Sequence, residues 1–215
     1  MIERAHGIIL RTRHFTETSL IVEWLTPESG RFSTVAKGAR RQKSPFRGKL
    51  DLFYEAEFSF NRSRRSELHT LSEVSLRETH SALRHDLGYV RQASYCAALI
   101  EQTTEKETPL PAIHELMRSF LAALPEHPPQ PRNIYAFELK LLEELGLQPD
   151  PDQTRLGAET RSLMEALLRE DWRQISTLKA AGAQVTELRR FLHGFLIHHL
   201  GKLPKGREDV LAQPA

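Results

Sequence analysis

The sequence predicts an α+β protein in two domains, a small β-barrel followed by an all-α domain. Apolar residues alternate as in strands up to about residue 80 and then recur every three or four positions as in helices. The first part contains five short strand-like segments joined by turns, which favours a closed barrel over βαβ units. Dividing the length of 215 residues by roughly 150 residues per domain gives one or two domains.

The expected strands follow one another at short intervals. The clearest has apolar residues at every second position between Leu52 and Phe60. A turn at 26–30 holds Pro27, which fixes φ, and Gly30, which tolerates a positive φ. The five expected strands cover residues 8–10, 20–24, 32–36, 52–60 and 68–76.

Six helices are expected after residue 80. Gly146 is suited to end one of them, because glycine readily takes the left-handed conformation of a helix C-cap. Asp171, with Gln174 three residues later, forms a capping-box pattern that begins another. The expected helices cover about residues 83–98, 112–124, 133–145, 156–169, 171–181 and 186–200.

These segments predict a barrel domain over residues 1–80, a helical domain over 81–203 and a weakly ordered tail over 204–215. Apolar residues make up 40% and charged residues 27%, which suits a folded core with a solvated surface. The sequence has no signal-peptide pattern and no apolar run of membrane-spanning length. The single cysteine, Cys96, cannot form an intramolecular disulfide, so we expect a cytoplasmic protein without membrane association.

The net charge of +2 hides a local concentration of positive charge. Residues 1–82 carry 14 Lys and Arg against 10 Asp and Glu, whereas the rest of the chain carries 16 against 18. Residues 31–49 contain basic side chains and no acidic one. Such a run is either a solvated loop or a phosphate-binding groove, in which cations replace the counterions condensed on a nucleic acid.

The sequence contains no pattern typical of catalysis or nucleotide binding. It has neither a Gly-x-Gly-x-x-Gly nor a Gly-x4-Gly-Lys-Ser/Thr loop. His193 and His198 are five residues apart, whereas two metal ligands on one helix face need a spacing of three or four. We therefore assign no catalytic residue and expect a binding protein rather than an enzyme.

Three stretches of the chain resemble a known family. The first runs from Glu17 to Thr26 and continues through Gly30-Arg-Phe and Val35-Ala-Lys-Gly-Ala-Arg. The second is Phe137-Glu-Leu-Lys-Leu-Leu-Glu-Glu-Leu-Gly, and the third is Leu200-Gly-Lys-Leu-Pro-Lys-Gly-Arg. Together they resemble the RecO family of bacterial recombination mediators, with the first stretch the most specific.

The resemblance implies an OB-fold for the barrel and a helical domain after it. It implies binding to single- and double-stranded DNA, annealing of complementary strands, and contacts with RecR and with the C-terminal tail of the single-stranded-DNA-binding protein SSB. Through these contacts such proteins help to load RecA on SSB-coated DNA. It also implies a nucleoid-associated location within the cytoplasm.

One departure from the family concerns zinc. Many members carry a four-cysteine zinc module after the Leu-Gly turn of the central helix. Here residues 148–157 contain no cysteine and are too few for that module. We therefore expect no zinc module, no metal and no cofactor.

The expected DNA contacts are cations of the barrel domain. An OB-fold binds nucleic acid through a sheet face and its flanking loops, with cations along the backbone and aromatic rings under bases. Phe46 is a candidate for stacking, because it lies in the basic loop, whereas Phe32 and Phe53 are expected in the core. The candidate phosphate contacts are Lys37, Arg40, Arg41, Lys43, Arg47 and Lys49, then Arg11 and Arg13 as weaker candidates, and Arg64 and Arg65 as an extension.

Two other functions stay open. In the first, the helical domain acts chiefly as an adaptor for RecR and SSB. The SSB tail needs an apolar pocket rimmed by cations, and Ala136 stands where family members often have a basic residue, so Arg132 or Lys140 would have to substitute. In the second, the barrel is an RNA-binding OB protein, because a basic track alone does not distinguish ribose from deoxyribose.

Overall fold

The computed structural model describes residues 2–150 and 154–212. It divides into two compact units. The first, called here the barrel unit, comprises the described residues up to 82 together with 104–118. The second, called the helical unit, comprises 83–103 and the described residues from 119 onward.

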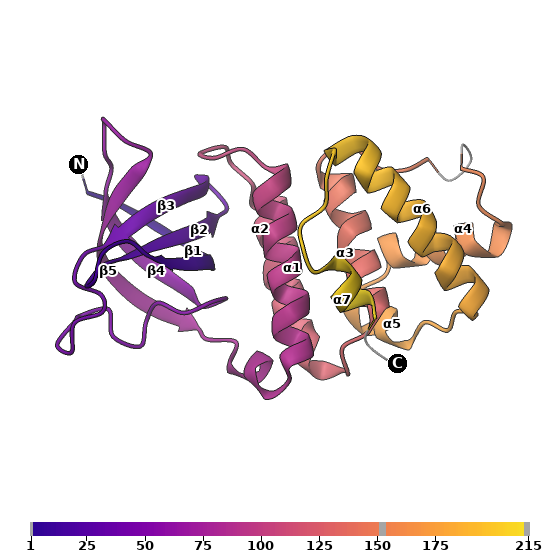
Figure 1. The fold of residues 1–215 in the computed structure, drawn as a ribbon, viewed down its shortest axis with the longest axis horizontal. Coiled ribbons are helices and arrows are strands. Elements are labelled where there is room, and N and C mark those ends of the chain that lie inside the picture. The colour runs from indigo at the N-terminus through magenta and orange to yellow at the C-terminus, as the bar shows by residue number, and fades with distance from the viewer. Residues whose placement is uncertain (1, 151–153, 213–215) are drawn as a thin grey trace. The chain divides into compact units, whose positions relative to one another are not determined.

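Five strands of the barrel unit close into a barrel, as the sequence predicts. Their order around the barrel is β1-β2-β3-β5-β4, and all neighbours are antiparallel except β3 and β5. The long first strand makes closure possible, because its first half pairs with β4 and its second half with β2. The strands, indigo to purple in Figure 1, are β1 (Ile2–His14), β2 (Leu20–Thr26), β3 (Gly30–Ala36), β4 (Glu55–Asn61) and β5 (Leu68–Glu78).

Aromatic side chains fill the barrel interior. Trp24 stacks on Phe58 with ring centroids 3.9 Å apart, and Phe32 lies 4.9 Å from Phe60. The Trp24 indole Nε1 donates a hydrogen bond of 2.9 Å to the Thr34 hydroxyl, which satisfies its polar atom inside the core. A closed barrel with a filled interior has no free sheet edge and forms a rigid support for its loops.

The fourth strand begins later than the alternation predicts. Phe53 is 2% exposed and so buried as expected, but its φ of 66° is not that of a strand residue. Its N–H donates to the Ile9 carbonyl (2.8 Å), and the Ile9 N–H donates to the Tyr54 carbonyl (2.9 Å). Residues 52–54 therefore form an irregular connection fixed to β1, and β4 starts at Glu55.

A segment distant in sequence packs against the barrel. Arg31 is 5% exposed and its Nε donates 2.7 Å to the Thr104 hydroxyl, while the Glu107 N–H donates to the Arg31 carbonyl. Gly30 has a φ of 63°, and a Cβ there would lie 1.8 Å from the Thr108 carbonyl oxygen. Residues 104–118 thus belong with the barrel, which the sequence-based boundary at residue 80 does not anticipate.

The helical unit is built around one buried helix. Consecutive residues Ile134–Leu139 of α3 are all buried, so this helix has no solvent face there. Helices α1, α4, α5 and α7 contact it. The helices, magenta to yellow in Figure 1, are η1 (Ser81–His85), α1 (Leu87–Thr103), α2 (Pro111–Ala123), η2 (Leu124–Glu126), α3 (Pro131–Glu144), α4 (Ala158–Arg169), α5 (Trp172–Thr177), α6 (Gly182–Leu200) and α7 (Arg207–Leu211). Helices η1 and α2 cross the division between the two units.

Two local predictions in this unit are confirmed. Gly146 follows the end of α3 with a φ of 69°. The Asp171 side chain accepts from the Gln174 N–H (2.8 Å), and the Gln174 side chain accepts from the Asp171 N–H (3.2 Å), which completes the capping box of α5. None of the helices in the described ranges combines the length and the hydropathy that a membrane span requires.

The expected weak order of the C-terminal tail is wrong for its described part. Residues 207–211 form α7, in which Arg207, Val210 and Leu211 are buried. Arg207 forms two hydrogen bonds with Glu138 at 2.7 and 2.8 Å, and Tyr95 donates to the same carboxylate at 2.6 Å. A paired buried charge and two apolar side chains hold this segment. Residues 213–215 lie outside the described residues.

Candidate nucleic-acid interface

The connection between β3 and β4 carries most of the predicted DNA contacts. Its residues 37–49, called here the basic loop, fold as a succession of short turns. In five of them an N–H donates to the carbonyl three residues earlier, as from Arg41 to Gly38 and from Lys49 to Phe46 (both 3.0 Å). Gly38 and Gly48 take positive φ values that allow the reversals. The loop therefore has a defined backbone that can hold its side chains in place.

Phe46 is the apolar anchor of this loop, and the expectation that it is exposed and so a candidate for stacking on bases is wrong. Its side chain is 6% exposed and packs with the barrel core. Alternation could not reveal this, because the residue lies in a loop between Pro45 and Arg47 and only the three-dimensional path of the loop brings it to the barrel. Phe32 and Phe53 are buried, as expected.

The cations of the basic loop point to solvent. Lys37, Arg40, Arg41, Lys43 and Arg47 are exposed. Lys49 is half-buried, and its Nζ donates to the Val74 carbonyl at 3.0 Å. Within the described part of the chain, no carboxylate lies within ion-pair distance of any of the six. They form one positive surface whose charge is not neutralised locally.

The turn between β1 and β2 is attached to this loop. The Arg40 N–H donates to the Thr18 carbonyl (3.0 Å), and its guanidinium donates to the Glu17 carbonyl (2.8 Å). A hollow of about 320 Å³ lies beside this junction, lined by Leu20, Ala39, Arg40, Arg41, Gln42, Phe46, Arg47, Gly48 and Leu50. The β1–β2 turn and the basic loop are thus joined on one side of the barrel, although the turn itself carries Glu17 and no Lys or Arg.

The two weaker candidates on β1 differ from each other. Arg11 stands directly opposite Glu23 in the β1–β2 pairing, so an acidic residue is its direct cross-strand neighbour. Arg13 stands opposite Ile21 and is exposed, two residues nearer to the turn that touches the basic loop. The structure favours Arg13 as a neighbour of the positive surface.

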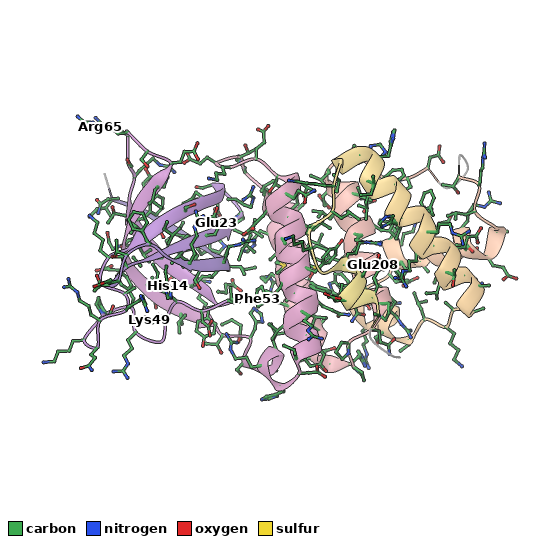
Figure 2. The ribbon with its side chains drawn as sticks, viewed as in Figure 1. His14, Glu23, Lys49, Phe53, Arg65 and Glu208 are labelled. Carbon is green, nitrogen blue, oxygen red and sulfur yellow. The ribbon has the colours of Figure 1, made fainter. Side chains whose placement is uncertain are left out.

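The hairpin between β4 and β5 forms a separate cluster. Arg64 and Arg65 are exposed there, and Figure 2 shows Arg65 at the tip of this hairpin, well apart from Lys49. Arg62 is engaged instead: it pairs with Glu3 (2.8 Å) and Glu107 (3.0 Å), and its hydrogen bond lowers the pKa of Glu3. The structure does not join Arg64 and Arg65 to the basic loop.

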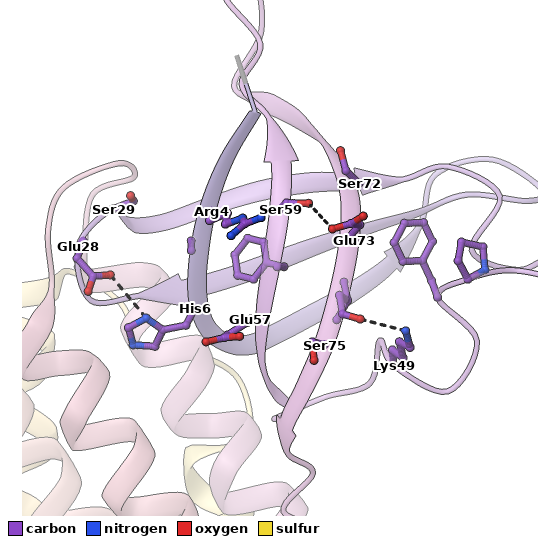
Figure 3. Close-up of a pocket in the computed structure, with 15 residues that line it drawn as sticks. Arg4, His6, Glu28, Ser29, Lys49, Glu57, Ser59, Ser72, Glu73 and Ser75 are labelled. Carbon is purple, nitrogen blue, oxygen red and sulfur yellow. Dashed lines mark hydrogen bonds and ion pairs between the residues drawn. The ribbon is translucent and has the colours of Figure 1, made fainter.

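A second hollow of the barrel unit is a poor anion site. It has a volume of about 810 Å³ and lies over β1, β4 and β5 (Figure 3). Arg4 and Lys49 line it, but so do Glu28, Glu57 and Glu73. Three carboxylates repel a phosphate backbone, so charge rather than volume selects the basic loop as the candidate interface.

The helical unit shows what Arg132 and Lys140 do. The Arg132 guanidinium donates to the carbonyls of Ser176 and Leu178, and the Lys140 Nζ donates to the carbonyls of Leu168 and Glu170. Both cations therefore satisfy the C-terminal carbonyls of α4 and α5. Burial lowers the pKa of Lys140. Whether these residues also receive an SSB tail stays a prediction.

The histidine, cysteine and acidic residues that could bind a metal or act in catalysis do not cluster in the described part of the chain. No group of three or more His, Cys, Asp or Glu suited to a metal ion occurs among the described residues, from which 151–153 of the 148–157 loop are missing. Cys96 is buried, and burial raises the pKa of its thiol, which suits a core residue rather than a ligand or nucleophile. The expectation of no metal stays a prediction.

One exposed side chain beside the basic loop is not predicted from the sequence. Phe15, in the turn between β1 and β2, is 53% exposed. The sequence offers one sign of this exposure. Phe15 lies in the polar stretch His14-Phe-Thr-Glu-Thr-Ser, in which no strand or helix periodicity places it on a buried face.

Comparison with known proteins gives a consistent result over most of the chain. Residues 1–80 match the family model described as Recombination protein O N terminal, and residues 84–156 match Recombination protein O C terminal. The chain is 35% identical over 153 residues to the DNA repair protein RecO of Anaeromyxobacter sp. (strain K), which covers 71% of this chain and 60% of that protein. It is 31% identical over 159 residues to the DNA repair protein RecO of Listeria monocytogenes serotype 4b (strain F2365), which covers 74% and 62%. The match thus spans about three fifths of the length of these relatives.

Proposed function

Because the chain belongs to the RecO family, we propose that it acts in DNA repair and recombination by binding DNA through the basic loop. The observation that carries this proposal is a set of six cations on one ordered loop with no carboxylate partner among the described residues. Unpaired cations on a folded loop are costly through mutual repulsion, and a polyanion relieves that cost.

The binding mode that this surface supports is independent of base sequence. Lys37, Arg40, Arg41, Lys43 and Arg47 present charges to solvent, and Lys49 adds one beside Val74 of β5. Cations that contact phosphates release condensed counterions, which supplies the free energy of binding and makes it depend on salt. The same contacts reduce the repulsion between two complementary strands, which supports annealing as part of the proposal.

The loop backbone contributes by being preformed. Its turns, its Phe46 anchor and the Arg40 contact to the β1–β2 turn fix the positions of the cations before DNA arrives. A preformed site loses less conformational entropy on binding than a mobile basic tail does. We assign Arg13 to the edge of this site and Arg64 and Arg65 to a separate contact.

The partner roles belong to the same proposal. Within the cytoplasm, at the nucleoid, the protein would meet SSB through the SSB C-terminal tail, bind RecR, and so help RecA to load, as a mediator and not as an enzyme. The helical unit is the part we propose for the SSB tail. Titration of the full chain with an SSB-tail peptide tests this: micromolar binding supports the role, and no binding removes it.

The test of DNA binding is its salt dependence. We expect the alanine variant of Lys37, Arg40, Arg41 and Lys43 to bind single strands more weakly, with a log–log salt slope smaller by roughly 0.7 for each phosphate that the variant no longer neutralises. The matched control is the alanine variant of Arg173, Lys179, Arg190 and Lys202, four exposed cations of the helical unit that remove the same net charge.

The two variants separate a local site from a general charge effect. An unchanged slope in the loop variant would refute the proposed interface. Equal reductions of affinity in both variants would show that net charge alone governs binding. RNA that displaces DNA at equal concentration would favour an RNA-binding function instead.

A further inference from the structure

Phe15 is unlike every other aromatic residue of the chain. All 16 Phe, Tyr and Trp residues lie in the described ranges, and among them Phe15 alone is exposed, at 53%. The other aromatic rings are buried or half-buried. Aromatic rings are normally at least partly buried, because removing their apolar surface from water is favourable. The exposure of Phe15 therefore needs a physical reason.

The turn that carries Phe15 does not need its side chain. The Phe15 N–H donates to the Ser19 carbonyl (3.0 Å), and the Ser19 N–H donates to the Thr16 hydroxyl (3.1 Å). The turn is thus closed by backbone groups and by the Thr16 hydroxyl. Any residue that tolerates this backbone would preserve the turn, so the ring itself has no structural task there.

This turn is fixed to the basic loop. The Arg40 N–H donates to the Thr18 carbonyl, the Arg40 guanidinium donates to the Glu17 carbonyl, and the Gly38 N–H lies 3.5 Å from the Ser19 hydroxyl. The turn that carries Phe15 is therefore held against the loop that carries the cations, and Arg13 lies two residues before Phe15 in the chain.

We propose that Phe15 is a stacking platform for a base of single-stranded DNA whose phosphates lie on the basic loop. The inference rests on the proposed function and adds to it a source of strand preference. An unpaired base can turn its flat face onto an exposed ring, whereas a duplex keeps the faces of its bases stacked inside. Cations then give affinity for any DNA, and Phe15 gives preference for single strands.

An apolar protein partner fits this position less well. A protein interface needs a contiguous apolar patch, and the residues flanking Phe15 are His14 and Thr16, both exposed and polar. Ile2, the other exposed large apolar side chain of the barrel unit within the described residues, lies at the opposite end of β1. A single ring on a turn that is attached to a cation-rich loop suits a base, which has a flat apolar face and an attached phosphate.

The test uses three variants of the full chain with an oligothymidylate strand and a duplex. We expect Phe15→Ala and Phe15→Leu to weaken binding to the single strand by roughly five- to one-hundredfold, and duplex binding by less than about twofold. The salt slope of both variants should stay that of the unchanged protein, because every phosphate-binding cation is retained. Phe15→Trp should retain single-strand affinity and show fluorescence quenched by the strand.

Each outcome decides the inference. Leucine equal to phenylalanine would show an apolar contact without stacking and overturn it, as would equal reductions of affinity for single strand and duplex. Single-strand affinity unchanged in Phe15→Ala overturns it as well. The proposed function fails separately, through an unchanged salt slope in the four-cation loop variant, whatever Phe15 does.

Discussion

The basic loop and helix α7 both carry positive charge, and the two regions hold it in different ways. Arg207 of α7 is 3% exposed and paired with the fully buried Glu138, which is also bonded to Tyr95. Burial alone lowers the pKa of Arg207, but the hydrogen bonds and charge of Glu138 outweigh it and raise the pKa. The loop cations face solvent instead, without such a partner. The basic loop leaves its charge available for a ligand, whereas α7 uses its charge to join two segments that are distant in the sequence.

The largest effect on stability is expected from breaking the buried pair. Arg207→Ala leaves the Glu138 carboxylate buried without its counter-charge, which should lower the free energy of unfolding by about 3–5 kcal/mol. Urea denaturation followed by circular dichroism measures this. A decrease below about 1 kcal/mol would show that α7 does not depend on the pair. Glu138→Gln with Arg207→Met should recover much of the stability, because the double variant buries no unpaired charge.

The next largest effect on stability depends on pH and comes from a buried histidine that stays neutral. His114 is 5% exposed, and burial, with the nearby His6, lowers its pKa from 6.5 to about 4. Between these values the unfolded chain binds a proton that the folded chain does not, so stability falls as pH decreases from 6.5 towards 4. At pH 5 the lowered pKa of His114 reduces the free energy of unfolding by about 2 kcal/mol relative to neutral pH. His114→Phe should remove this part of the pH dependence; equal pH profiles for variant and parent would contradict the prediction.

Arg62 is intermediate, because its pairs with Glu3 and Glu107 are partly exposed. Arg62→Ala should cost about 1 kcal/mol at pH 7. Arg62 lowers the folded-state pKa of Glu3, so the stability that this pair contributes is present above the ordinary value of 4.5 and disappears as pH falls through the lowered pKa. Denaturation at pH 7 and at a series of decreasing pH values measures the difference; a destabilisation that keeps the same size however far the pH is lowered would exclude the ion pair as its cause.

The smallest effect on stability is expected in the basic loop. Arg41→Ala and Lys43→Ala remove exposed side chains without a carboxylate partner in the described structure, so the free energy of unfolding should change by less than about 0.5 kcal/mol. DNA binding by the same variants should weaken. Thermal unfolding and salt-dependent binding on one sample separate the two. A clear decrease in stability would remove the distinction between the two regions.

The sequence-based picture is accurate where the physics is local. The switch from alternating to helical periodicity, the Asp171–Gln174 capping box and the basic loop each depend on residues close together in the chain. The start of β4 is predicted too early, because Phe53 is buried from a left-handed conformation that no alternation describes. The order of the tail is not predicted, because Glu138, its partner, lies 69 residues before Arg207.

The sequence by itself determined the barrel, the helices after it, the family and the position of the cation-rich loop. Only the tertiary structure decided that residues 104–118 return to the barrel, that Phe46 is an anchor, and that Phe15 is exposed beside the loop. Charge and the periodicity of apolar residues can be read from the sequence, because they depend only on residues close together in the chain. Burial of an isolated side chain depends on which distant segments cover it, and that is fixed only when the chain has folded.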